Sequence, residues 1–299
     1  MKKVAIVTGG VSSERVIALR SASNVVDLLR DTFEITTFDF PKDINLFFQK
    51  YHEIELVIPF LHGKGGEDGT IQGFLETLGL PYLFSGVQAH AIALDKEKTK
   101  ILVSAVGIKT LQSRTIEKGD PVHYYHPVVV KPLDGGSSVA TAIAKSQEEL
   151  IKACESASAH SVKVLIEDFV AGQEFTIAVV EKDGRTTALP VIAITPKDGF
   201  FDFSSKYNQD NLADEICPAP INRELSDKLQ AIAQLAHVSL GCRHVSRTDI
   251  IVDHNGEAWF LETNTIPGMT ATSLLPKAQI ASGTSLKEIL CGWINKEIG

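Results

Sequence analysis

The sequence predicts an α/β fold with α+β regions, and three observations lead to this class. Apolar segments at residues 4–7 and 56–60 are each followed by a glycine-rich turn and a helical pattern. Such segments are typical of parallel strands that are covered on both faces. Later segments, at 174–194 and 247–264, instead show the Asx-Gly turns of antiparallel hairpins. The length of 299 residues favours more than one domain.

Composition and charge exclude several classes of protein. Hydrophobic residues make up 44% of the chain and charged residues 22%, as in soluble globular proteins. The net charge of −8 includes no basic run, so neither nucleic acid nor a membrane surface is an expected partner. The four cysteines lack a metal-binding spacing, and the N-terminal apolar segment is too short for a signal peptide. A cytoplasmic protein with reduced thiols is expected.

The first strand leads into a helix that we expect to begin at Glu14, with Ser12 or Ser13 as its N-cap. Simple compensation of the helix dipole would explain Glu14 at this point. The turn has neither a Gly-x-Gly-x-x-Gly fingerprint nor a Walker A motif. An NAD-dependent oxidoreductase is therefore the least favoured function.

The second strand, residues 56–60, runs into His62 and a loop with four glycines in the eight residues 62–69. This much glycine is usually retained where the chain approaches a ligand or adopts positive φ. Open α/β sheets bind ligands at the carboxyl ends of their strands. His62 is therefore predicted to belong to a site, against the alternative of a structural histidine.

The middle of the chain has a different texture. The alternating lysines of residues 95–100 predict a solvated helix face, and the first domain is expected to end before them. A strand at 127–132 carries Lys131 and precedes a Gly-Gly-Ser-Ser loop, which suits a phosphate, although a flexible turn is the alternative. A further strand delivers Glu167, an acidic group for a nucleoside. Residues 199–207 form a candidate lid, with a packed surface loop as the alternative.

The hairpin at 247–264 holds the most informative cluster. With either a two-residue or a four-residue loop, odd positions of its first strand pair with even positions of its second. Arg247, Asp249, Glu262 and Asn264 would then project from one face. Two carboxylates and an amide favour divalent cations and their phosphates. A solvated face with an ordinary ion pair is the alternative.

Seven stretches, taken together and in this order, resemble the D-alanine–D-alanine ligases, which are ATP-grasp enzymes, over essentially the whole chain. They are Gly9-Gly10-x-Ser12-x-Glu14-Arg15, His62-Gly63-Lys64-Gly65-Gly66-Glu67-Asp68-Gly69, Lys131-Pro132 with Gly136-Ser137-Ser138-Val139, Glu167-x-Phe169-Val170-x-Gly172-x-Glu174-Phe175, Lys206-Tyr207, Arg247-x-Asp249, and Glu262-x-Asn264-Thr265-x-Pro267-Gly268-Met269-Thr270.

The resemblance implies a three-domain ATP-grasp fold with an N-terminal parallel-sheet domain. The expected domains are residues 1–94, 95–178 and 179–299, with ATP between the last two. In this family ATP phosphorylates the carboxylate of a first D-alanine, and the amine of a second attacks the acyl phosphate. The product, D-alanyl-D-alanine, serves peptidoglycan precursor synthesis. The implied cofactors are ATP and two Mg²⁺ ions, with Mn²⁺ as an alternative. The implied partners are small molecules, with a homodimer by family analogy.

The resemblance also implies roles for individual residues. Glu14, Ser137 and Tyr207 match a hydrogen-bonded triad that closes the lid, which reverses the dipole explanation of Glu14, while Arg247 and the Gly268 amide match the oxyanion donors. Substrate binding is implied for Glu14, His62, Arg247, Gly268, Ser273 and Leu274. Nucleotide binding is implied for Lys96, Lys131, Ser137, Glu167, Phe169, Val170, Glu174 and Lys206. Metal binding is implied for Asp249, Glu262 and Asn264.

The chain departs from the family pattern at Ala18, where serine is usual, and at Phe84 and Ala140, where glycine is usual. Ala18 and Phe84 are expected near the substrate. They are the support for an alternative, an ATP-grasp carboxylate–amine ligase with a different amino-acid specificity. A non-catalytic nucleotide-binding relative is a second alternative, against which the four hairpin residues argue.

Overall fold

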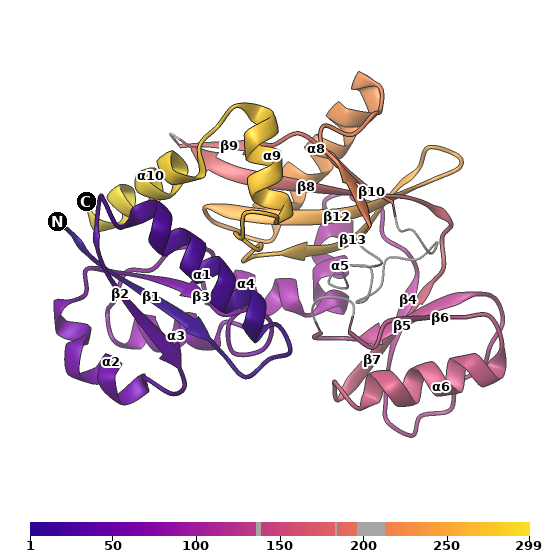
Figure 1. Ribbon diagram of the computed structural model, residues 1–299. Helices are drawn as coiled ribbons and strands as arrows, with labels where there is room; N and C mark the ends of the chain where they lie inside the picture. Colours follow the sequence, from indigo (N-terminus) through magenta and orange to yellow (C-terminus); the bar gives the residue numbers. More distant parts are fainter. Residues whose placement is uncertain (136–138, 183, 196–212) are drawn as a thin grey trace.

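The computed structural model describes residues 1–135, 139–182, 184–195 and 213–299, and these residues form three sheets (Figure 1). The N-terminal sheet is parallel, with the strand order β2-β1-β3. The side chains of β3 are buried along its whole length, which confirms the predicted strand at 56–60. The elements of this region are β1 (Lys3–Gly9), α1 (Arg15–Leu29), β2 (Glu34–Phe40), α2 (Ile44–Lys50), β3 (Leu56–Phe60), α3 (Thr70–Thr77) and α4 (Val87–Leu94), with a 3₁₀ turn at Tyr51–Glu53.

The start of α1 differs from the prediction. The helix begins at Arg15, Glu14 occupies the N-cap position, and no side chain caps the helix. The Ser12 hydroxyl accepts from the Glu14 N–H at 3.3 Å, just before the helix, and donates to the backbone carbonyl of His62 at 2.7 Å. The bond to His62 ties the turn after β1 to the glycine-rich loop after β3.

The central sheet is antiparallel, with the order β4-β7-β5-β6, and α6 covers one of its faces (Figure 1). Ser146, two residues after the end of β6, caps α6 by accepting a hydrogen bond from the Glu149 N–H through its side chain. The elements are β4 (Ser113–Glu117), β5 (Val128–Pro132), β6 (Ala142–Ala144), α6 (Gln147–Ser158) and β7 (Lys163–Asp168).

Helix α5 (Lys96–Ala105) connects these two regions, and its orientation corrects the prediction of a solvated lysine face. Lys96 and Lys100 are buried, whereas Ile101 on the same helix is 64% exposed. The two lysines are four residues apart and therefore lie on one face of the helix. This face points inward because each lysine forms an ion pair with a glutamate inside the protein, Lys96 with Glu262 and Lys100 with Glu167.

The third sheet has the order β11-β10-β8-β12-β13, with β9 also paired to β8. Between β9 and β10 the chain contains Pro190, which lacks the N–H that a continuous strand would need. The predicted domain division after residue 178 falls within β8. The elements are β8 (Gly172–Lys182), β9 (Arg185–Ala188), β10 (Ile192–Thr195), β11 (Asp214–Ile216), α8 (Arg223–Ser239), β12 (Val245–Asp253), β13 (Ala258–Asn264), α9 (Leu274–Ser282) and α10 (Leu286–Ile298).

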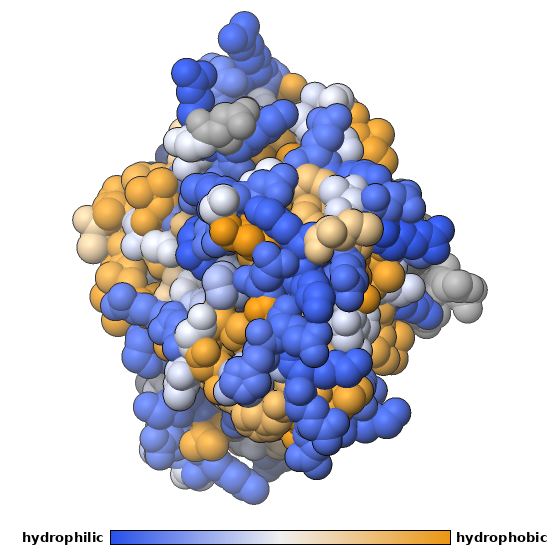
Figure 2. Space-filling model, turned by 90° about the vertical axis from the view of Figure 1, so that its left-hand side faces the viewer, coloured by the Kyte–Doolittle hydropathy of each residue, from blue (hydrophilic) through white to orange (hydrophobic). Residues whose placement is uncertain are grey.

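One apolar core joins the N-terminal and third sheets. It contains Ile6 of β1, Leu29 of α1, Ala178 of β8 and Leu290 of α10. Helix α10 returns to pack beside α1, so both termini lie at the same end of the molecule (Figure 1). The face at this end is mixed in polarity, with hydrophobic residues gathered along one margin (Figure 2). Among the described residues, no helix combines the length and the apolarity needed to cross a bilayer.

Phe84 holds a backbone conformation that is unusual for its side chain, with φ of 75°. Its ring is fully buried and packs edge-on against Phe60, with the ring centroids 5.5 Å apart. Both of its backbone polar groups are held by the segment before β12: its N–H donates to His244 Nδ1, and its carbonyl accepts from Arg243 Nε, each at 3.0 Å. These contacts offset the steric cost of the left-handed conformation.

We expect Phe84→Ala and Phe84→Gly to destabilise the protein by about 3 kcal/mol or more, because each leaves a cavity where the ring was. The glycine variant should be the more stable of the two by about 1 kcal/mol, since glycine adopts positive φ without strain. Urea unfolding of both variants measures the difference. An alanine variant equal to or more stable than the glycine variant would contradict the strain at this position.

Candidate active site

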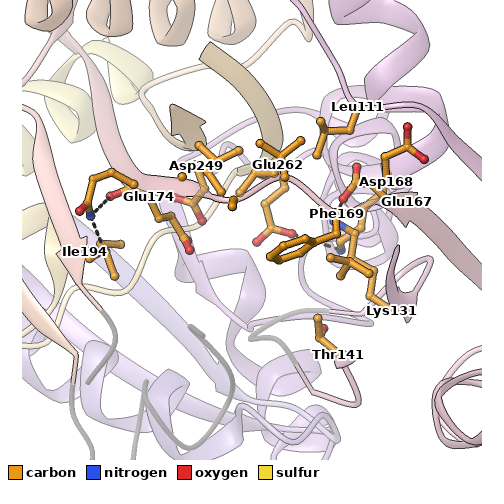
Figure 3. A pocket seen from close by; sticks show the side chains of 18 of the residues that line it. Leu111, Lys131, Thr141, Glu167, Asp168, Phe169, Glu174, Ile194, Asp249 and Glu262 are labelled. Carbon is orange, nitrogen blue, oxygen red and sulfur yellow. Dashed lines mark hydrogen bonds and ion pairs between the residues drawn. The ribbon is translucent and has the colours of Figure 1, made fainter. Parts of the chain in front are cut away.

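Two cavities meet at the hairpin formed by β12 and β13. One, of about 460 Å³, lies between the central and third sheets, and the other, of about 570 Å³, lies between the third sheet and the N-terminal region. Asp249 and Glu262 line both cavities. Figure 3 shows the two carboxylates projecting from neighbouring strands into the first cavity. A group bound in either cavity could therefore reach the same pair of carboxylates.

The register of this hairpin is partly different from the prediction. Next to the turn, Val252 pairs with Ala258, so even positions face even positions. A β-bulge beside Asp249 then shifts the register by one residue. As a result Asp249 faces Glu262 and Arg247 faces Asn264, and all four residues line the second cavity. The prediction that they share a face is confirmed, but the bulge is what brings it about.

Asp249 is almost completely buried and is held by two neighbours. Arg247 donates to both of its carboxylate oxygens, from Nε at 3.1 Å and from a terminal nitrogen at 2.9 Å. The hydroxyl of Thr176, on the adjacent strand β8, donates to the same carboxylate at 2.5 Å. These bonds fix the carboxylate at the junction of the two cavities. Thr176 was not predicted, because a threonine within a strand gives no signal in the sequence.

Lys96 performs a similar task on the other carboxylate. Its Nζ atom lies 3.3 Å from Glu262 Oε2 and donates to the backbone carbonyl of Gly135 at 2.6 Å. Lys96 therefore connects the hairpin to the start of the Gly-Gly-Ser-Ser loop after β5. It lines the first cavity, as the assignment to a phosphate site requires.

The first cavity combines a flat apolar space with charged groups at its walls. Leu111, Val129, Val170 and Leu261 are among the apolar residues that line it. The six predicted nucleotide residues that the structure describes all line it too: Lys96, Lys131, Glu167, Phe169, Val170 and Glu174. Such a cavity, apolar with a few convergent polar groups, is the usual form of a site for a small molecule.

Lys131 and Glu167 point toward one another across neighbouring strands (Figure 3). Lys131 Nζ lies 2.8 Å from Glu167 Oε2, and the Glu167 side chain is only 2% exposed. Lys100 of α5 contacts the other oxygen of this carboxylate from behind the cavity wall. Sequence reasoning missed Lys100, although its position four residues after Lys96 was a usable signal.

The second cavity has one polar end close to the N-terminal region. Glu14, His62 and Arg247 line this end. Burial lowers the pKa of His62, and the positive charge of Arg247 acts in the same direction against the opposing effect of Glu14. The imidazole is therefore neutral at physiological pH, which suits a hydrogen-bonding role.

The other end of this cavity is formed by the loop after β13 and by the start of α9. Gly268, Ser273 and Leu274 line it, and Ser273 stands at the N-cap position of α9. A Cβ atom at position 268 would come within 2.9 Å of the Ser273 hydroxyl oxygen, so a larger residue there would have to displace this hydroxyl. A helix N-terminus offers unpaired N–H groups to an anion.

Glu67 links the two loops that border this second cavity. One of its carboxylate oxygens accepts from Gly63 N–H at 2.8 Å, and the other accepts from Ile266 N–H at 3.2 Å. Burial raises the pKa of Glu67 to about 8, and the charge of Glu14 acts in the same direction, against both hydrogen bonds. The glycine-rich loop and the loop after β13 are thus fixed to each other by one buried acid.

Several residues singled out in the sequence do not line the two cavities. Ala18 and Phe84 are fully buried and are not among the residues that line either cavity. Ser137, Lys206 and Tyr207, together with the predicted lid, lie outside the described residues. Lys277 and Glu215, which sequence reasoning missed, form an ion pair of 2.6 Å in the wall of the second cavity.

Comparison with known families gives one consistent result. Residues 103–295 match the family model described as the C-terminus of D-ala D-ala ligase, and residues 41–85 match the model of its N-terminus. A D-alanine–D-alanine ligase of Halalkalibacterium halodurans is 36% identical over 98% of both chains. That of Clostridium beijerinckii is 38% identical over 96% of both chains.

Solved structures are similar over nearly the whole length. A D-alanine–D-alanine ligase from Bacillus anthracis, determined in complex with ATP, superposes with a TM-score of 0.85 at 29% identity and covers 100% of this chain and 98% of its own. The VanG D-Ala:D-Ser ligase from Enterococcus faecalis superposes with a TM-score of 0.84 at 29% identity, with 98% of both chains covered.

Glu67 should make stability depend on pH. Its folded pKa of about 8 lies above the ordinary value of 4.5, so the folded state holds a proton that the unfolded state releases. The resulting stabilisation is complete below about pH 4.5 and is lost as pH rises toward 8, by roughly 1 kcal/mol per pH unit. Urea unfolding at pH 6, 7 and 8 measures this slope.

Glu67→Gln is the matched control, because it keeps the side-chain shape and cannot titrate. We expect the difference in unfolding free energy between wild type and variant to change steadily over this pH range. A constant difference would show that Glu67 is already ionised in the folded protein.

Proposed function

The chain belongs to the D-alanine–D-alanine ligase family, and from this premise we propose that it joins two D-alanines to D-alanyl-D-alanine at the expense of ATP. The carboxylate of the first D-alanine takes a phosphoryl group, and the amine of the second displaces phosphate from the acyl phosphate. The product serves peptidoglycan precursor synthesis. The observation that carries the proposal is the shared wall of Asp249 and Glu262 between the two cavities.

We assign ATP to the first cavity. Phe169, Val170 and the apolar wall would enclose the adenine, and Glu167 would accept from its amino group. Glu174 would bind the ribose. Lys96 and Lys131 would meet the phosphates, because their ammonium groups lie on the wall of this cavity. The proposed phosphate contacts of Ser137 and Lys206 come from the family resemblance alone.

We assign two Mg²⁺ ions to Asp249, Glu262 and Asn264. The donor set fits the ion, because Mg²⁺ prefers oxygen ligands and shares its coordination with waters and substrate phosphates. The Nδ2 atom of Asn264 is buried without a hydrogen-bond partner among the described residues, so the protein does not fix this amide. When bound, the ions would screen the charge of the transferring phosphoryl group.

The second cavity would receive both amino acids. Glu14 would bind the ammonium group of the first D-alanine, with His62 beside it, and Arg247 would stabilise the oxyanion together with the Gly268 amide. Arg247 suits this task because its donors are planar and permanently charged. Ser273 and the Leu274 amide, at the start of α9, would bind the carboxylate of the second D-alanine. Glu14, Ser137 and Tyr207 are proposed to close the lid.

The alternatives lose support in the fold. A changed amino-acid specificity rested on Ala18 and Phe84, and neither residue lines a cavity. A non-catalytic relative would have no need of both the carboxylate pair and Arg247. D-alanine is therefore the favoured substrate at both positions.

We further propose that the enzyme is cytoplasmic and forms a homodimer. Its four cysteines are free thiols, and its co-substrate ATP is an intracellular nucleotide. The dimer surface that we propose is the outward face of α5 and α8, which pack together. Its exposed apolar side chains are Ile101, Leu102, Val106, Leu235 and Val238. A patch of this kind on a globular protein favours a partner.

Phosphate release from ATP and Mg²⁺ tests the proposed reaction, with D-alanine, L-alanine, D-serine and D-lactate added singly and in pairs. We expect phosphate release that depends on D-alanine, together with a D-alanyl-D-alanine mass in the product. Phosphate release with a different amino acid, and not with D-alanine, would keep the ligase reaction and assign it another substrate. No release with any pair, despite ATP binding, would refute the ligase function.

Arg247→Ala tests the proposed oxyanion donor in the same assay. Loss of an oxyanion donor should lower kcat by roughly a hundredfold or more, while calorimetry shows that ATP still binds. An unchanged kcat would contradict the role of Arg247 as an oxyanion donor.

Ile101→Glu tests the dimer surface, because a charge there would have to be buried on association. We expect the variant to elute as a monomer, with the mass measured by light scattering. Val162→Glu, a change at another exposed apolar position outside the patch, should remain dimeric. A dimeric Ile101→Glu protein would place the contact elsewhere.

A further inference from the structure

We propose that Lys100 is a positioning residue of the nucleotide site, which gives Glu167 a second ammonium partner and thereby leaves Lys131 available to the phosphates. This inference rests on the proposed function, in which Glu167 meets the adenine and Lys131 the phosphates. It adds a residue that lines neither cavity. Lys100 acts only through Glu167.

The geometry distinguishes the two lysines that hold Glu167. Lys131 Nζ contacts Oε2 from within the cavity, at 2.8 Å, whereas Lys100 contacts Oε1 from the buried side. Lys100 comes from the inward face of α5, one helical turn after Lys96, and its side chain is 5% exposed. Its Nζ atom also lies 3.4 Å from the backbone carbonyl of Leu111, a residue of the cavity wall.

The charges require both lysines. A buried carboxylate is costly unless it is paired, and Glu167 is 2% exposed. Suppose that Lys131 were the only partner of Glu167 and moved to bind a phosphate. Glu167 would then either take up a proton or compete with the phosphate for the Lys131 ammonium group. With Lys100 behind it, the carboxylate stays paired while Lys131 is shared. Burial and the charges of Lys131 and Lys96 lower the pKa of Lys100 to about 6, and Asp168 acts against them. The ammonium form of Lys100 at neutral pH therefore depends on its direct contact with Glu167.

The charge of Glu167 matters for recognition of the base. An ionised carboxylate only accepts hydrogen bonds. It therefore favours the amino group at position 6 of adenine and repels the carbonyl oxygen at position 6 of hypoxanthine. A protonated Glu167 would donate to that oxygen instead. Preference for ATP over ITP thus reports on the ionisation of Glu167. If Lys100 had only a structural role, its replacement would leave this preference unchanged.

The experiment compares wild type, Lys100→Met and Lys100→Arg in D-alanine-dependent turnover with ATP and with ITP, and in calorimetric binding of both nucleotides. We expect Lys100→Met to raise KM for ATP and to lower the preference for ATP over ITP, each by about tenfold, with a smaller effect on kcat. Lys100→Arg, which keeps the charge, should retain most of the preference.

Lys98→Met is the matched control, because Lys98 lies on the same helix, is exposed and forms an ion pair with Asp95, three residues before it. It should behave as wild type. If Lys100→Met shows the wild-type KM and the wild-type preference, the inference is overturned. If wild type itself shows no turnover that depends on D-alanine, the proposed function fails, whatever the variants do.

A double variant decides the question even if Lys100→Met does not fold. Lys100→Met combined with Glu167→Gln removes both charges together, and it is compared with Glu167→Gln alone. Equal preferences for ATP over ITP in these two proteins support action through Glu167. A further loss in the double variant would show that Lys100 acts on another group, and would overturn the inference.

Discussion

The pairing of Asp249 with Glu262 across β12 and β13 is the constraint on which the rest of the site depends. Two carboxylates this close repel each other unless cations accompany them. Arg247 accompanies Asp249, and Lys96 accompanies Glu262. The bulge beside Asp249 sets this arrangement, since without its one-residue shift the side chains of one strand would change faces. The two cavities can share one pair of carboxylates only because the strand register is interrupted there.

The need for positive charge at this junction explains the unusual helix α5. A helix on the surface usually buries its apolar side and exposes its lysines. In α5 the lysines at 96 and 100 are buried against Glu262 and Glu167, and Ile101 faces outward. The helix therefore has two separate tasks. Its inner face balances the acids of the nucleotide cavity, and its outer face carries the apolar side chains of the proposed dimer surface.

The cavity for the amino acids depends on contacts between regions far apart in sequence. Glu67 joins the loop after β3 to the loop after β13, and Ser12 joins the turn after β1 to His62. A shared apolar core beneath them holds α1 against α10 and the third sheet. Packed interiors resist gradual deformation, so the two halves of this cavity keep a fixed spacing.

The sequence by itself determined most of the strands and the residue types that gather at the hairpin, because these follow from local periodicity, turn chemistry and short motifs. The tertiary structure decided what depends on distant partners. Lysines at 96 and 100 look solvated in any local window, and only the acids of β7 and β13 explain their burial. Phe84 adopts positive φ because Arg243 and His244 hold its backbone polar groups. Likewise, the bulge at the hairpin and the clamp formed by Glu67 arise where strands and loops meet in space, and no local pattern records such meetings.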